Sequence, residues 1–105
     1  MYATHVKAMT NFSVGTCTIE LYLPGVASLK EKRGILKSML ARLHNTYNVS
    51  AAEVDHHDVW QSAAIAVAAI SNSTSHAQQI VSKIPDWIEA NFPDVYIVKQ
   101  TIEIR

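Results

Sequence analysis

The chain has 105 residues, of which 49% are hydrophobic, so it is long enough for one domain with a single buried core and too short for two. Nine basic and nine acidic residues give a formal net charge of zero, which excludes attraction of nucleic acid or anionic membranes by overall charge. A single cysteine, Cys17, excludes an internal disulfide framework and a multi-cysteine zinc site. No apolar run resembles a signal peptide or a membrane span, so we expect a cytoplasmic protein with no membrane partner.

The periodicity of apolar residues predicts six elements in the order β-α-β-β-α-β. Pro85 lies inside the second helical pattern and lacks a backbone donor, so we expect a kink or a break near Ile84. Residues 1–13 fit neither period, and we expect a flexible leader there, before a single domain over residues 14–105. The expected elements are a strand at Val14–Leu23, a helix from Ser28 to about Asn45, a strand at Asn48–Val54, a polar connection at Asp55–Gln61, a strand at Ala63–Ile70, a helix from Ser73 or Ser75 to Asn91, and a strand at Val95–Ile104.

This order of elements is that of the ferredoxin-like fold, an α+β arrangement in which a four-stranded antiparallel sheet carries two helices on one face. The other face of the sheet is left uncovered. Small side chains from the third strand would form a smooth floor there, which suits a second protein surface and predicts a homodimer. The residues expected on this face are Thr16, Thr18, Tyr22, Ala64, Ala66 and Ala68.

The run Ser28–Arg33 predicts both the start of the first helix and a one-sided cationic surface. Ser28 can accept a hydrogen bond from the first turn, and Glu31 can reach back to the Ser28 N–H as a capping box. At about 100° per residue, Lys30, Arg33 and Lys37 share one stripe of this helix, beside a stripe of core residues. Lysine and arginine contact phosphates without reading sequence, so the stripe is a candidate RNA-binding surface. An ordinary solvated helix face is the alternative interpretation.

The connection Asp55–Gln61 gathers two histidines, two aspartates and a tryptophan. Imidazole and carboxylate groups bind divalent metals and transfer protons, so a metal-dependent or acid–base enzyme that uses the Asp55–Asp58 loop is an alternative function. Adjacent histidines diverge in extended chain, which is a poor spacing for metal ligands. The structural alternative is a hydrogen-bonded loop held by Trp60, with its indole on the rim of the core. We name no catalytic residue, metal ligand or cofactor, and treat His56, His57 and Trp60 as a second contact of a binding surface.

Four short segments carry a resemblance to a known family, namely Leu21–Gly25, Ser28–Arg33, Asn48–Val54 and Asp58–Gln61. In combination they resemble the YlxP-like bacterial proteins, over about Val14 to Arg105. That family has a ferredoxin-like fold and no known function, and its genes often lie near those of translation and ribosome-maturation factors. The resemblance therefore implies a ribosome- or RNA-associated role and supplies no catalytic residues. The chain departs from the family at Gly34, where a larger, often basic residue is usual.

These observations together predict a small non-catalytic binding module. Its expected partner is ribosomal RNA or a ribosome-associated protein, which it would contact through the basic stripe of the first helix.

Overall fold

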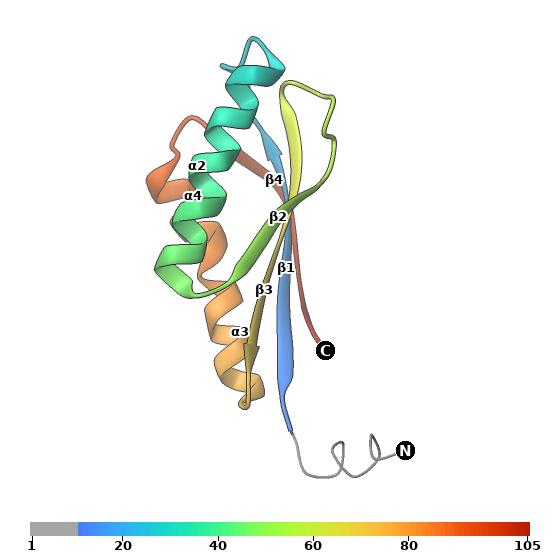
Figure 1. Cartoon of the computed structure of the whole chain (residues 1–105), viewed down its shortest axis with the longest axis vertical. Helices are drawn as coiled ribbons and strands as arrows, with labels where there is room; N and C mark the ends of the chain where they lie inside the picture. The colour runs from blue at the N-terminus through green and yellow to red at the C-terminus, as the bar shows by residue number, and fades with distance from the viewer. Residues whose placement is uncertain (1–10) are drawn as a thin grey trace.

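A computed structural model describes residues 11–105 as one four-stranded sheet with helices packed on a single face (Figure 1). All strand pairs are antiparallel, and the strand order is β2-β3-β1-β4. This is the predicted ferredoxin-like α+β fold. The elements are β1 (Ser13–Tyr22), α2 (Leu29–Tyr47), β2 (Ser50–Asp55), β3 (Ser62–Ser71), α3 (Thr74–Ser82), α4 (Ile84–Asn91) and β4 (Tyr96–Ile104).

Each predicted element is present, and its ends agree with the sequence-based boundaries to within one or two residues. Ser13, which we assigned to the leader, is the first residue of β1, and residues 1–10 of the expected leader lie outside the described part of the chain. The second predicted helix is interrupted at Lys83, which confirms the break near Ile84. Pro85 lies in the first turn of α4, where its missing N–H removes no helical hydrogen bond.

The core lies between the sheet and the helices, and the alternation in β1 and β3 determines which side chains enter it. Apolar side chains of these two strands that face the helices are buried, among them Cys17, Ile19, Leu21, Ile65 and Val67. Opposite them lie apolar residues of the helices, Leu36, Met39, Leu43, Val81, Ile84 and Ile88. In β1, Gly15 allows α3 to approach the sheet closely, because a Cβ on this residue would lie 2.8 Å from the carbonyl oxygen of Ala77.

Helix α2 begins at the predicted cap, with a small correction. The Ser28 side chain accepts a hydrogen bond from the Glu31 N–H at 3.1 Å. The Glu31 carboxylate accepts one from the Ala27 N–H at 3.2 Å, whereas the predicted capping box gave that role to the Ser28 N–H. The helix ends at Asn48, whose φ of 51° is the left-handed conformation that asparagine tolerates at a C-cap. Across residues 11–105, no helix combines the length and the hydropathy that crossing a membrane requires.

Candidate functional site

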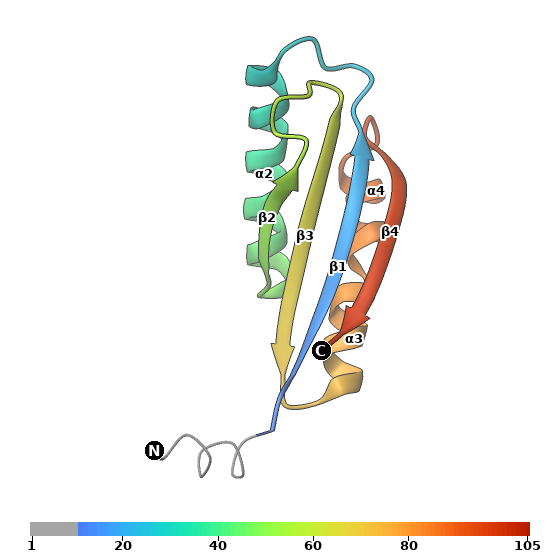
Figure 2. The same ribbon diagram turned by 90° about the vertical axis from the view of Figure 1, so that its right-hand side faces the viewer.

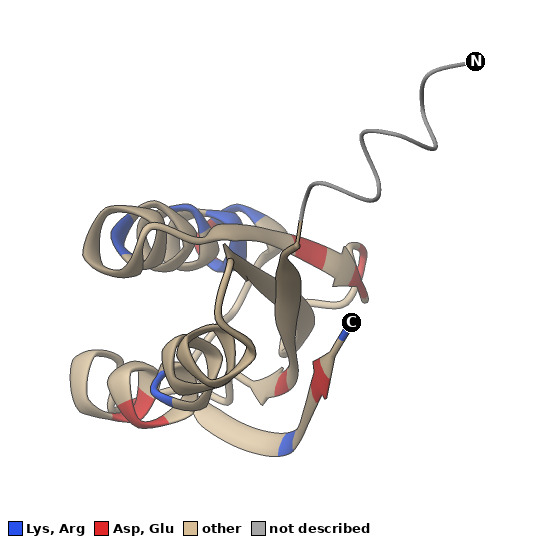
Figure 3. Cartoon of the chain, turned by 90° about the horizontal axis from the view of Figure 1, so that it is seen from below, with Lys and Arg blue, Asp and Glu red and all other residues tan. Residues whose placement is uncertain are grey.

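The predicted basic stripe lies on the exposed surface of α2. Lys30, Arg33 and Lys37 are all exposed, and none of them forms an ion pair within residues 11–105. Arg42 marks the opposite side of the helix, because its guanidinium stacks 5.3 Å from the ring of Trp87 on α4. At about 100° per residue, the three stripe residues lie roughly 120–180° around the helix from Arg42. Figure 3 shows most basic positions of α2 on the side turned away from α3 and α4.

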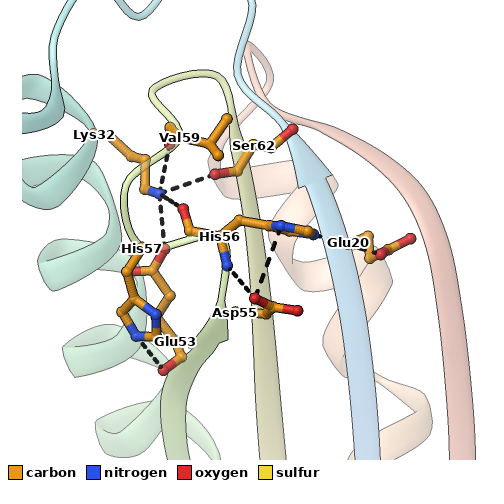
Figure 4. A network of polar contacts seen from close by, with 8 residues as sticks. All are labelled: Glu20, Lys32, Glu53, Asp55, His56, His57, Val59 and Ser62. Carbon is orange, nitrogen blue, oxygen red and sulfur yellow. Dashed lines mark hydrogen bonds and ion pairs between the residues drawn. The ribbon is translucent and has the colours of Figure 1, made fainter.

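The run Ser28–Arg33 is not a purely solvent-facing cationic surface, because Lys32 is completely buried. Its ammonium group donates hydrogen bonds to the carbonyl oxygens of His56, Val59 and Ser62, at 2.6, 2.7 and 2.9 Å (Figure 4). An ammonium group has three donors, so these bonds use all of them. Lys32 therefore ties the β2–β3 connection to the first turns of α2.

The buried charge of Lys32 is balanced by Glu53 of β2, whose Oε2 atom lies 2.9 Å from the lysine nitrogen. Glu53 Oε2 is itself buried and accepts no hydrogen bond from the described residues, so its contribution is the ionic attraction. A buried ammonium group without an opposite charge would be strongly destabilising. The pair and the three carbonyl acceptors together make Lys32 a buried anchor of the connection.

Lys32 is the functional-site residue that sequence reasoning missed. The available signal was its position four residues before Leu36 and eleven before Leu43, which places it on the buried stripe of α2. A lysine on an apolar stripe needs a partner for its charge. Its acceptors lie 21 to 30 residues away in the chain, from Glu53 to Ser62, and only the tertiary structure brings them to it.

The side chains of the two histidines point to different places, as expected for neighbours. The imidazole of His56 lies 3.7 Å from the Glu20 carboxylate of β1, while the Asp55 carboxylate accepts a hydrogen bond from the His56 N–H at 2.8 Å. The imidazole of His57 is directed to the Glu53 carbonyl oxygen at 3.2 Å (Figure 4). Within residues 11–105, no group of three His, Cys, Asp or Glu side chains is arranged to hold one metal ion.

A shallow hollow of about 310 Å³ on the uncovered sheet face lies next to this histidine cluster. Glu20 and Asp55 line it together with Lys99 of β4, and Ala64 forms part of its floor. Glu20, Asp55 and Lys99 are therefore the ionisable side chains that line this hollow. The hollow also shows that the uncovered face is less smooth at this end than the alanine pattern alone predicts.

Trp60 does not hold the connection in place, which corrects the structural alternative. Its side chain is 52% exposed, and no described residue accepts a hydrogen bond from its indole N–H. The loop is hydrogen-bonded as that alternative stated, but the anchor is Lys32. Trp60 therefore lies at the surface of a connection that Lys32 holds from its buried side.

The six residues predicted on the uncovered face occupy neighbouring strands in register. Thr16 pairs with Ala68, Thr18 with Ala66, and Tyr22 with Ser62 at the end of the strand. None belongs to the hydrophobic cluster between sheet and helices. Figure 2 shows this face of the sheet turned toward the viewer with the helices behind it.

Residues 11–105 thus define a small ferredoxin-like domain with a cationic helix surface and a lysine-anchored connection. A family model described as "Protein of unknown function (DUF503)" matches residues 14–102, and the chain belongs to this family. The chain is similar to the "Uncharacterized protein YlxP" of Bacillus subtilis (strain 168), with 33% identity over 82 residues that cover 78% of this chain and 88% of that relative. The resemblance to YlxP-like proteins is confirmed, and the matched region contains both the basic stripe and the anchored connection.

Proposed function

We propose that this protein is a non-catalytic, ribosome-associated binding module that contacts the phosphates of RNA through Lys30, Arg33 and Lys37. The observation that supports the proposal is that three exposed cations share one face of α2 and have no ion-pair partner within residues 11–105. The molecule has no net charge, so attraction of an anionic partner depends on a local cationic surface such as this one. From Lys30 to Lys37 the stripe extends about 10 Å along the helix axis, long enough to meet more than one phosphate.

The anchored connection supplies a second contact to the same partner. Lys32 ties it to the turn of α2 that also carries Arg33, so it is held at the same end of α2 as Lys30 and Arg33. The exposed indole of Trp60 can stack on an unpaired base, which is how proteins commonly recognise single-stranded RNA. His56 and His57 add hydrogen-bonding groups on the same connection. The expected ligand is therefore a structured RNA with an unpaired loop or end.

The salt dependence of RNA binding tests this proposal. Affinity for ribosomal RNA fragments should fall as salt rises, and replacing all three stripe residues by alanine should reduce the slope of log K against log salt by about 2, at roughly 0.7 per single-strand phosphate lost. The control compares two single variants that each remove one exposed lysine. Lys37→Ala should reduce the slope, whereas Lys83→Ala, which lies between α3 and α4, should leave it unchanged. No RNA retention at low salt, or a slope that the triple variant does not alter, would refute the proposal.

Self-association is a second proposal, favoured by the uncovered sheet face. Alanines of β3 and threonines of β1 form much of this surface, and Ile70 adds a strongly exposed apolar side chain at its end. A second copy would cover it. Ala66→Arg places a charge at the centre of the face without entering the core. Light scattering should therefore show that it dissociates a dimer formed through the face and leaves a dimer formed through another surface intact.

A further inference from the structure

β4 is the longer of the two free edges of the sheet. It pairs only with β1, and Figure 2 shows no other described element beside its outer side. β4 has nine residues against six in β2, and none of the nine is a proline. Unpaired N–H and C=O groups along such an edge form a ladder with another strand unless a proline, an inward charge or a covering element prevents it.

The β1–β4 ladder determines which backbone groups of β4 are free. Val14 and Arg105 exchange two hydrogen bonds, of 2.9 and 2.8 Å. Every second pair of an antiparallel ladder is bonded in this way, and the register continues unbroken from there to the pair of Glu20 and Lys99. The residues between these bonded pairs direct their backbone groups away from β1, toward the free edge; they are Gln100, Ile102 and Ile104.

Apolar side chains lie along the same edge. Ile102 and Ile104 are 37% and 36% exposed although they point to the helix side of the sheet, and Val98 is 67% exposed at the bulge of β4. A fully paired strand covers such side chains with those of its second neighbour. The edge therefore has both free backbone groups and uncovered β-branched side chains.

The charges on β4 are arranged so that the strand is complementary to itself. Lys99 and Glu103 lie on the uncovered face, two residues on either side of Thr101. Lys99 forms no ion pair within residues 11–105, and the Glu103 carboxylate pairs there only with Arg105, at 3.0 Å in an exposed pair of the kind that adds little stability. Around a two-fold axis at Thr101, the lysine of each copy meets the glutamate of the other.

We propose that β4 pairs antiparallel with β4 of a second copy, centred on Thr101, which joins two four-stranded sheets into one continuous sheet. Lys99 then lies directly opposite Glu103 of the second copy in a pair without backbone hydrogen bonds, where the Cα atoms are only about 4.5 Å apart. Gln100 and Ile102 form the bonded pairs on either side of the axis. This assignment rests on the self-association proposed above, and places the contact at the edge of the sheet instead of on its face.

Other registers of the same edge are less favourable. Residues that direct their backbone groups to the free edge must lie opposite one another in the two copies. The alternative registers therefore shift the centre of the pairing by one residue in either direction. A centre at Ile102 places Lys99 opposite Arg105, which repels it. A centre at Gln100 places Lys99 opposite Thr101 and leaves no pair of opposite charges. Only the register centred on Thr101 uses both charged residues of the strand.

The β2 edge is a poor site for the same contact. β2 lies beneath α2, whose basic stripe is turned away from α4 and therefore toward the outer side of β2. Two copies joined through β2 would bring their cationic helices together. Joined through β4, they keep both stripes at the far ends of the sheet, free for an anionic partner.

Charge exchange on the full chain tests the proposal. Sedimentation velocity from about 10 to 500 µM, a range suited to a small interface, should show a monomer–dimer equilibrium for the wild type. Lys99→Glu or Glu103→Lys turns two attractive pairs into two repulsive ones and should weaken dimerisation about ten-fold or more at low salt. The double variant Lys99→Glu/Glu103→Lys exchanges the two charges and should restore the wild-type constant. Ala66→Arg, on the sheet face, should have no effect.

A folding defect is distinguishable from the loss of a contact. Lys99→Glu also faces Glu20 of its own sheet, and the double variant keeps that repulsion, so recovery of the dimer in the double variant can come only from the contact between copies. A wild-type monomer at every concentration would overturn self-association and this assignment with it. A dimer that Ala66→Arg dissociates and charge exchange does not alter would overturn the edge assignment and leave self-association standing. A dimer insensitive to all of these changes would also overturn the edge assignment.

Discussion

Replacing Lys32 by methionine should destabilise the protein more than any other single change in the candidate site. The substitution keeps most of the side-chain volume and removes the charge, which leaves three loop carbonyls without their donor and the Glu53 carboxylate without an opposite charge. Removing one partner of a buried ion pair costs about 3–5 kcal/mol. Against a typical total of about 5–15 kcal/mol, this is a large share of the free energy of unfolding.

Urea unfolding followed by circular dichroism measures this loss. With a slope of about 1.5 kcal/mol per molar urea, the midpoint of Lys32→Met should fall by roughly 2–3 M. Lys30→Met is the matched control two residues away, and as an exposed change it should stay within about 0.5 kcal/mol of the wild type. Adding Glu53→Gln to Lys32→Met removes the stranded carboxylate charge and should recover about 1 kcal/mol or more. A loss below about 1 kcal/mol for Lys32→Met, or strictly additive effects of the two changes, would refute the role assigned to Lys32.

Four further tests concern the packing of two glycines, the buried thiol and the cap of α2. Gly15→Ala should cost about 1–3 kcal/mol in thermal unfolding, because its Cβ would lie 2.8 Å from the Ala77 carbonyl oxygen. Gly34 lies in the interior of α2 with nothing within 4 Å of a new Cβ, so Gly34→Ala should raise the free energy of unfolding by up to about 1 kcal/mol. A change of the same sign in the free energy of unfolding for Gly15→Ala and Gly34→Ala would contradict this account. Burial raises the pKa of Cys17 from 9.0 to about 11, so folded protein at pH 8 should react with thiol reagents far more slowly than protein in urea. Since the folded state has the higher pKa, stability should fall as pH rises from 9 toward 11, and Cys17→Ala, which removes the thiol, should show a smaller fall over the same range. Ser28→Ala should cost about 1 kcal/mol, and no loss would show that the cap contributes nothing to α2.

The sequence by itself determined the order and type of every element in the described chain. Period-two alternation in β1 and β3 is sufficient to identify their buried faces, because shifting a strand by one residue would move its whole apolar set to the exposed face. Pro85 was sufficient to predict the interruption between α3 and α4, since the constraint is local to the backbone. The exposure of Lys30, Arg33 and Lys37 followed from helical spacing alone.

Only the tertiary structure decided the role of Lys32, the anchor of the β2–β3 connection and the exposure of Trp60. The acceptors of Lys32 belong to residues that no local pattern links to it, and they converge because β2 and β3 pass beneath α2. The free backbone groups of β4 are equally invisible in the sequence, because they depend on the register with β1. Local periodicity specifies which face of an element is apolar, whereas the partner of a buried charge and the free edge of a sheet are properties of how elements are placed together.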